Sequence, residues 1–157
     1  MSKIICVTGH RPDKLGGYDR SVQVALERLA YTHLKEIAPT GVVTGMALGW
    51  DQAVAAACMD LGIPFLAAVP FHGQEGNWPS RSQELYRLYL SYASKIVYVC
   101  EGGYAAHKMQ TRNEWMVDHT SAVLALHDGT AGGTGNCVVY ARSKGKPIKN
   151  LWRYYRP

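Results

Sequence analysis

The chain has 157 residues, enough for one domain with a buried core, and 47% of them are hydrophobic while 18% are charged. This composition excludes a disordered protein, and no apolar run approaches the roughly 18 residues that span a bilayer. The formal net charge of +5 permits an anionic partner without identifying one. Because the first residues also lack the features of a signal peptide, we expect a cytoplasmic protein with no membrane partner.

Short β-rich apolar runs alternate with longer segments of helical period, the pattern of a parallel sheet covered by helices. In chain order, we expect strands at residues 4–8, 42–44, 64–69, 96–99, 122–126 and 147–151. Between them we expect helices at about 21–37, 51–61, 79–92, 109–119 and 137–142. No linker, repeat or low-complexity segment interrupts the pattern. Residues 1–157 are therefore predicted to form a single Rossmann-like α/β domain of three layers, with a mostly parallel sheet of about six strands.

Helix ends carry local signals that support these boundaries. Ser21 is a capping residue, Gly62 ends the second predicted helix, and Pro79 suits the first turn of the third. That third helix is expected to present an apolar face made of Leu85, Leu88, Tyr89 and Tyr92.

The four cysteines are widely separated and form no CxxC pair. Three of them stand in apolar stretches, where a thiol behaves as a small hydrophobic group. We interpret them as structural thiols, with metal or disulfide chemistry as the weaker alternative, and expect no metal site.

Parallel sheets place ligand sites in the loops beyond the carboxyl ends of their strands. The notable polar and glycine residues fall in four such loops, at residues 8–11, 44–51, 70–78 and 127–136. We therefore expect the ligand site at this edge of the sheet.

The loop at 127–136 gives the strongest local signal. Glycines let backbone N–H groups approach an anion closely, and the helix that follows offers its positive end. The alternative is a flexible glycine turn. Because the sequence matches neither GxGxxG nor the P-loop, it does not indicate hydride transfer or nucleoside triphosphate hydrolysis. The candidate ligand-binding residues here are Gly129, Thr130, Gly132, Gly133, Thr134 and Asn136.

The loop at 44–51 is also bounded by glycines and leads into a helix. Gly45 and Gly49 would admit close approach of a ligand to the backbone. Asp51 is placed either to cap the helix or to hold a ribose hydroxyl.

Two further loops contribute candidate ligand-binding residues. Gly9, His10 and Arg11 follow the first strand, and Arg11 would pair either with a phosphate or with a surface carboxylate. Trp78, like Phe71, would stack on a base or pack within the protein.

A second set of residues offers acid–base chemistry. Arg112 and Glu114 stand near the start of a helix whose loop end should face the same cleft. Glu114 and Asp128 are the candidate catalytic carboxylates, together with Asp51. The structural alternatives are helix-dipole complementarity for Glu114 and turn formation for Asp128.

The segments VTGHRPDKLGGY, TGMALGWDQAVA, PFHGQEGNWP, RNEWMVDHTSAVLALHDGTAGGTGN and KGKPI together resemble the YpsA-like branch of the SLOG superfamily. That superfamily also contains the Rossmann domain of DNA-processing protein A and the Lonely Guy phosphoribohydrolases. The likeness covers nearly the whole chain in order. It implies a Rossmann-like sheet and a nucleotide-type ligand held by the glycine loops.

The resemblance does not carry the Lonely Guy mechanism over intact. Those enzymes cleave the N-glycosidic bond of nucleoside monophosphates with a GGxGTxxE motif and an upstream arginine. Alignment of that motif on residues 132–135 puts Asn136 at the threonine and Val139 at the glutamate, while Arg112 could stand for the arginine. Since Val139 cannot transfer a proton, the resemblance implies a phosphate cradle without that acid.

These observations favour a protein that binds a nucleotide or nucleotide-derived ligand as a sensor, regulator or sequestering protein, with no separate cofactor. The first alternative is a nucleoside 5′-monophosphate N-glycosidase that uses Glu114, Asp51 or Asp128. The second is single-stranded DNA binding by the basic tail, residues 142–156, with its aromatic side chains Trp152, Tyr154 and Tyr155. Those aromatic residues would pack on the chain's own sheet or on a neighbour, so a homo-oligomer is left open.

Overall fold

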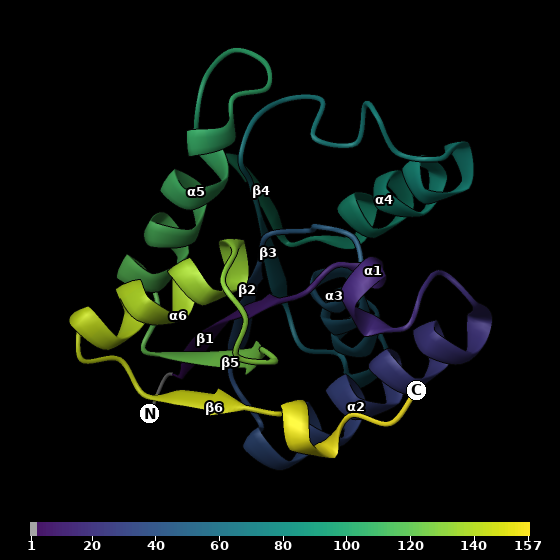
Figure 1. Ribbon diagram of the computed structural model, residues 1–157, viewed down its shortest axis with the longest axis vertical. Helices are drawn as coiled ribbons and strands as arrows, with labels where there is room; N and C mark the ends of the chain where they lie inside the picture. The colour runs from purple at the N-terminus through teal and green to yellow at the C-terminus, as the bar shows by residue number, and fades with distance from the viewer. Residues whose placement is uncertain (1–2) are drawn as a thin grey trace.

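The computed structural model describes residues 3–157. Met1 and Ser2, which belong to the predicted domain and to the N-terminal segment without signal-peptide features, lie outside the described residues. Strands and helices alternate along the described chain as predicted (Figure 1). The elements are β1 (Ile4–Gly9), α1 (Pro12–Leu15), α2 (Arg20–Ile37), β2 (Gly41–Thr44), α3 (Trp50–Leu61), β3 (Phe65–Val69), α4 (Ser80–Tyr92), β4 (Lys95–Tyr98), α5 (Ala106–Asp118), β5 (Ala122–Leu126), α6 (Gly133–Ser143), β6 (Ile148–Asn150) and the 3₁₀ turn η1 (Trp152–Tyr154).

The strands form one sheet in the order β4-β3-β2-β1-β5-β6, and every neighbouring pair is parallel. This confirms the predicted Rossmann-like α/β fold. At the centre, Cys6 of β1 lies opposite Val43 of β2 and Val123 of β5. The strand order proceeds in opposite directions on the two sides of β1, which makes its carboxyl end the switch point of the sheet.

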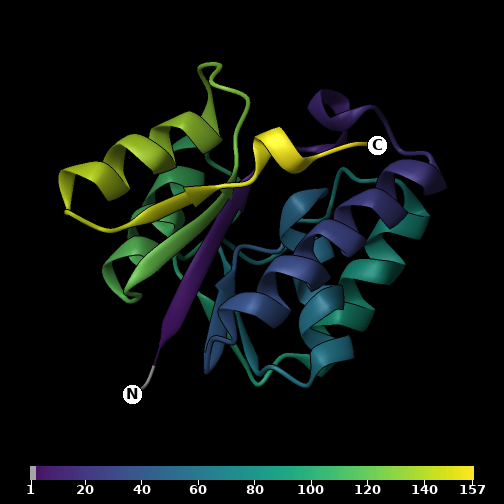
Figure 2. The same ribbon diagram turned by 90° about the horizontal axis from the view of Figure 1, so that it is seen from below.

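Helices cover both faces of the sheet, which gives the predicted three layers (Figure 2). The helices α2, α3 and α4 lie on one side, where Trp50, Phe65 and Leu34 belong to the larger buried core. The helices α5 and α6 cover the other side around Met116 and Cys137. No helix of the described chain is long and apolar enough to cross a membrane.

The apolar face predicted for α4 was wrong at two of its positions. Leu88 is 48% exposed and Tyr92 is 62% exposed, whereas Tyr86 and Tyr89 are buried. The reason is that α4 lies on the side of the sheet that ends in the edge strand β4, so only a narrow stripe of the helix meets the core.

A short helix that the sequence pattern did not predict packs against the end of the chain. The single-turn helix α1 follows β1 where a loop was expected, and its Leu15 is buried. The chain end crosses the molecule after β6, and the Tyr155 hydroxyl donates a hydrogen bond of 2.5 Å to the carbonyl of Leu15. Tyr155 therefore packs on the chain's own core.

Candidate functional site

A cleft of about 290 Å³ opens beyond the carboxyl end of β1, between the loops that follow β2 and β5. Ligand sites of open parallel sheets lie at this switch point. The cleft is lined by Thr8, Gly9, His10, Arg11, Asp13, Lys14, Ala47, Asp51, Met109, Arg112, Asn113, Gly132, Gly133 and Thr134.

The structure brings three of the predicted loops and the predicted arginine of α5 together around this cleft. The predicted site residues that line it are Gly9, His10, Arg11, Asp51, Arg112, Gly132, Gly133 and Thr134. Their roles toward a ligand stay predictions.

Arg112 is a buried cation held at the floor of the cleft. Its Nη1 donates to the carbonyls of Gly45, at 2.6 Å, and Ala68, at 3.2 Å, while its Nε donates to Asn113 Oδ1 at 2.9 Å. Burial lowers the pKa of Arg112, and the nearby Asp51 opposes this shift. Because these bonds fix the guanidinium at the ends of β2 and β3, it presents a preorganised positive charge to the cleft.

Asp51, the second residue of α3, is buried beside this cation. Its Oδ2 accepts a hydrogen bond of 3.3 Å from the Ala47 N–H, but its Oδ1 has no partner among residues 3–157. Burial raises the pKa of the Asp51 carboxyl to about 6, against the opposing effects of Arg112 and the Ala47 N–H. A buried, unpartnered carboxylate oxygen is costly for the free protein and is well suited to accept a donor from a ligand.

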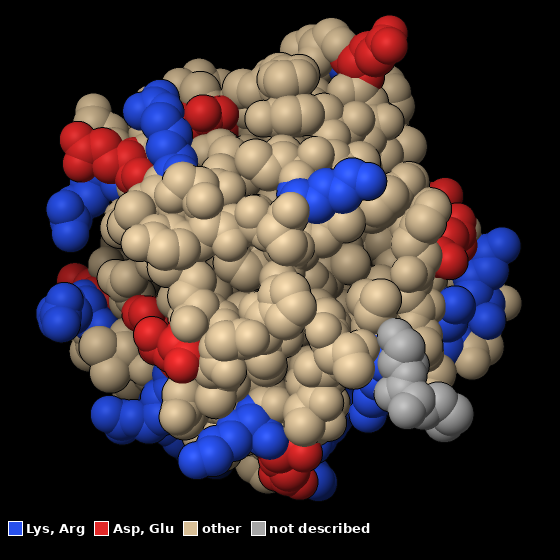
Figure 3. Space-filling view, turned by 180° about the vertical axis from the view of Figure 1, so that it is seen from behind, with Lys and Arg blue, Asp and Glu red and all other residues tan. Residues whose placement is uncertain are grey.

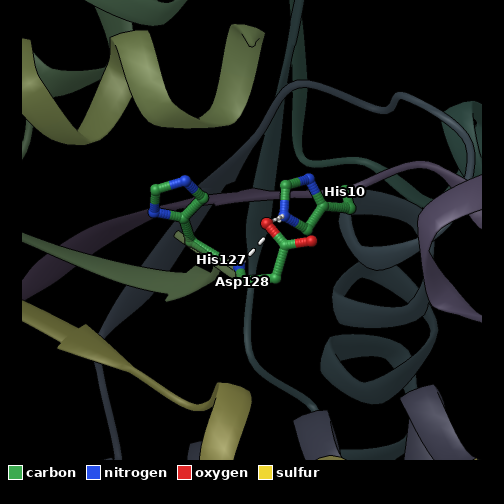
Figure 4. Close-up of side chains that lie close together, drawn as sticks. All are labelled: His10, His127 and Asp128. Atoms are coloured by element: carbon green, nitrogen blue, oxygen red, sulfur yellow. Dashed lines mark hydrogen bonds and ion pairs between the residues drawn. The ribbon is translucent and has the colours of Figure 1, made fainter. Parts of the chain in front are cut away.

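A second polar group ties the loop after β1 to the glycine-rich loop (Figure 4). His10 Nε2 lies 2.9 Å from Asp128 Oδ1 and 3.0 Å from the Asp128 backbone nitrogen. The same carboxylate oxygen accepts bonds from the Thr130 hydroxyl, at 2.6 Å, and the Thr130 N–H, at 2.9 Å. Lys14 Nζ in turn donates to the Thr130 hydroxyl at 2.8 Å. The network fixes the edge of the cleft.

The protonation of this network follows from its bonds. The Thr130 hydroxyl and N–H hold the pKa of the Asp128 carboxyl well below its usual range. Burial lowers the pKa of His10, although Asp128 acts in the opposite direction. An ionised Asp128 accepts hydrogen bonds but has no proton to donate, so it is not suited to act as a general acid, and its catalytic role stays a prediction.

His127 lies beside these residues, and one ligand atom each from His10, His127 and Asp128 falls within 4.8 Å of the others (Figure 4). These residue types bind transition metals. However, Asp128 Oδ1 is already engaged by Thr130, and His127 Nε2 lies 2.9 Å from the Thr130 carbonyl oxygen. The three side chains therefore organise the loop through hydrogen bonds.

The start of α6 forms the opposite wall. Gly132 has a φ of 143°, a conformation that favours glycine, and α6 begins at Gly133 without a side-chain cap. The first N–H groups of a helix lack partners inside that helix. Since Gly133 and Thr134 line the cleft, this end of α6 offers backbone donors to an anion.

Two predicted glycines stand behind the cleft and shape it. A Cβ on Gly45 would lie 2.5 Å from Arg112 Nη1, so glycine is needed there for the arginine to approach the backbone. A Cβ on Gly49 would lie 2.7 Å from the His10 carbonyl oxygen. Both glycines permit close packing of protein against protein.

The remaining predicted residues lie away from the lining. Trp78 packs edge-on against Tyr86, with ring centroids 5.2 Å apart, which favours the packing alternative. Glu114 is half-buried and accepts a bond of 3.2 Å from Gln110 Nε2. Asn136 is exposed on α6, and Gly129 is exposed in the loop before it.

Sequence reasoning missed several residues that line the cleft. Asp13 and Lys14 belong to α1, which was expected to be a loop, and Asn113 follows Arg112 directly. Pro12 followed by Gly16 and Gly17 is a pattern that could have predicted this short helix, because proline favours the first turn of a helix and glycine its end.

The fold and cleft define a Rossmann-like α/β protein with an open cleft at the switch point of its sheet. The model of the YspA SLOG family matches residues 5–149, and the chain belongs to that family. It is 35% identical over 130 residues to the uncharacterized SPbeta prophage-derived protein YoqJ of Bacillus subtilis, covering 72% of this chain and 75% of that protein. A UPF0398 protein of Bacillus cereus is 25% identical over 98% of this chain and 89% of its own.

Solved structures share the fold at low sequence identity. DNA processing protein A of Streptococcus pneumoniae superposes with a TM-score of 0.70 at 17% identity, covering 94% of this chain but only 49% of that one. The chain thus spans about half the length of that protein. The molybdenum cofactor binding protein of Rippkaea orientalis has a TM-score of 0.61 at 15% identity, covering 94% of this chain and 75% of that one.

Proposed function

We propose that the cleft binds a nucleotide or nucleotide-derived ligand and that the protein acts as a sensor, regulator or sequestering protein. The observation that carries this proposal is that one cleft holds both a fixed cation and a hydrogen-bond acceptor without a partner in the described chain. Arg112 supplies a fixed positive charge, and Asp51 Oδ1 supplies a buried acceptor without a partner in the described chain. A ligand with an anionic group and a hydroxyl group satisfies both.

The anionic half of the ligand is expected to be a phosphate. Arg11 and Lys14 line one side of the cleft and the start of α6 lines the other. Guanidinium, ammonium and helical N–H groups together recognise phosphate oxygens.

The hydroxyl half of the ligand is expected to be a ribose. A carboxylate that accepts a bond from a sugar hydroxyl is a recurrent feature of nucleotide sites in Rossmann-like folds. The cleft volume of about 290 Å³ is at the lower end of small-molecule pockets, which favours a mononucleotide over a dinucleotide. The structural likeness to a molybdenum cofactor binding protein is consistent with a small-molecule ligand.

Titration of the purified protein with nucleoside mono-, di- and cyclic nucleotides by calorimetry is expected to reveal saturable binding. Replacement of Arg11→Ala should weaken binding of the best ligand by about 10- to 150-fold, because a hydrogen bond to a charged group contributes about 1.5–3 kcal/mol. Arg11 is exposed, so the variant should fold. The matched control is Arg142→Ala, which removes an exposed arginine outside the cleft. Equal weakening by both variants, or no binding at millimolar nucleotide, would contradict the proposal.

A second candidate function is cleavage of the N-glycosidic bond of a nucleoside 5′-monophosphate. The observation that favours it is Asp51, whose pKa of about 6 suits a general acid near neutral pH. Val139, at the position of the Lonely Guy glutamate, is 65% exposed and does not line the cleft.

If the cleft catalyses this reaction, free base accumulates on incubation with one nucleotide and is detected by liquid chromatography. Asp51→Asn should then abolish base release while Glu114→Gln, which alters a carboxylate outside the lining, leaves it unchanged. Absence of base release at high protein concentration would leave binding alone.

Single-stranded DNA, the ligand named for DNA processing protein A of Helicobacter pylori, has less support here. Of the three aromatic residues in the tail, Tyr155 is buried and Trp152 is half-buried, which leaves Tyr154 for stacking. On the back of the molecule, seen in Figure 3, Lys and Arg are scattered and interleaved with Asp and Glu, so this face offers no continuous basic stripe as an alternative to the tail.

A further inference from the structure

A second cavity, of about 350 Å³, lies behind the candidate site between α2, α3 and α4. Its walls include Val22, Leu26 and Leu85 and are mainly apolar. Gly49 marks the boundary with the cleft, because a Cβ there would lie 2.7 Å from the His10 carbonyl oxygen and 3.2 Å from Arg11 Cα. The two loops are in contact at this point, so the cavities are separate.

Acidic side chains of α2 and its N-terminus border this apolar space. Asp19, the residue before α2, makes no side-chain cap bond, and Glu27 is half-buried two turns further along. Neither forms an ion pair within the part of the chain that the structure describes. Burial and the negative charge of Asp60 raise the pKa of Glu27, while a hydrogen bond from Gln23 and the positive charge of Arg20 act in the opposite direction. Because the raising effects prevail, a further positive charge brought to this carboxylate would be favourable.

The cavity lining also includes an aromatic side chain, Tyr89, and a single arginine, Arg81. Tyr89 lies close enough to Glu27 for that carboxylate to raise the pKa of its hydroxyl, after the larger effect of burial. Tyr89 also lines the cavity, and aromatic rings attract cations. Among the residues described as lining the cavity, Arg81 is the one cation, and it is exposed.

We propose that this cavity is a second ligand site, for a small organic amine whose apolar body fills the space and whose ammonium group pairs with Glu27. An apolar pocket with a few convergent polar groups is the usual form of a small-molecule site. Charge complementarity selects a cation, because two carboxylates, Asp19 and Glu27, line the cavity, whereas Arg81, the one cation among its described lining residues, is exposed. This site is independent of the nucleotide proposed for the cleft.

Three probes of nearly equal size test the charge preference: 2-phenylethylamine, 2-phenylethanol and phenylacetate. Each is titrated into the isotope-labelled full chain and followed through backbone amide chemical shifts. The amine is expected to shift amides of α2 and α4 around Leu26 and Ser82, and to bind roughly 10-fold tighter than the alcohol. Phenylacetate is expected to bind more weakly than either. Tighter binding of phenylacetate, or shifts confined to the cleft, would overturn the proposal.

The variant Glu27→Gln tests the assigned carboxylate. It keeps the shape of the side chain and removes its charge, so the amine should fall to the affinity of the alcohol while the alcohol is unchanged. Glu84→Gln, an exposed change on α4 outside the cavity lining, should leave the preference intact. An amine preference that survives Glu27→Gln would refute the pairing, and a folded Ser82→Phe variant that still binds the amine would refute the cavity.

Discussion

Replacement of Gly9→Ala is expected to destabilise the protein by about 3 kcal/mol or more, a large part of the stability of a domain this size. A Cβ at this position would lie 2.4 Å from Trp50 Cδ1 and 2.6 Å from Trp50 Cβ. The clash is with a side chain that has no exposed surface, at the first residue of α3. Gly9 itself pairs with Leu126 of β5, so the strand cannot retreat without loss of the sheet register. Urea unfolding measures the effect.

The matched control for this change is Gly103→Ala. Gly103 lies in the exposed loop after β4, where an added Cβ meets no atom within 4 Å and the backbone is not left-handed. Its free energy of unfolding should change by about 0.5 kcal/mol or less. Equal stability of the two alanine variants would show that β1 and α3 separate more easily than their packing indicates.

The fold was predictable from the sequence because apolar runs and helical periods alternate without interruption. The period-2 and period-3.6 patterns report which side of an element is buried, and a parallel sheet is what such elements form. The same logic located the cleft, since loops after parallel strands meet at one edge. The sequence alone therefore predicts that Gly9, Asp51 and Gly133 lie near one another, and all three line the cleft.

What the sequence could not reveal depends on contacts between distant segments. The exposure of Leu88 and Tyr92 follows from the position of α4 near the edge of the sheet, and strand order is not encoded in the pattern of one helix. The link from His10 to Asp128 joins residues 118 positions apart. The sequence singled out Gly45 as a residue that a ligand could approach. In the structure its missing Cβ instead lets the Arg112 guanidinium lie against the backbone.

The substitution Asp51→Asn is expected to stabilise the free protein at neutral pH while it weakens the ligand. Burial raises the pKa of this carboxyl from its ordinary 3.8 to about 6. Between these values the folded protein holds a proton that the unfolded chain has released, so the free energy of unfolding falls as the pH rises through this window. The cost is complete above pH 6 and amounts to roughly 3 kcal/mol at 1.36 kcal/mol per pKa unit.

Because asparagine does not titrate, the variant should lack this loss of stability. Urea unfolding at pH 4, 5, 6 and 7 should give similar stabilities for the two proteins at pH 4 and a growing advantage for Asp51→Asn toward pH 7. A difference that is constant with pH would contradict the assigned burial of the charge. Nucleotide affinity should move in the opposite direction, because the amide keeps the bond from the Ala47 N–H but replaces the unpartnered carboxylate oxygen with a donor. A residue whose removal stabilises the fold and impairs binding serves its ligand and not the fold. This pair of results would therefore favour the ligand-binding role of Asp51 over the structural capping role.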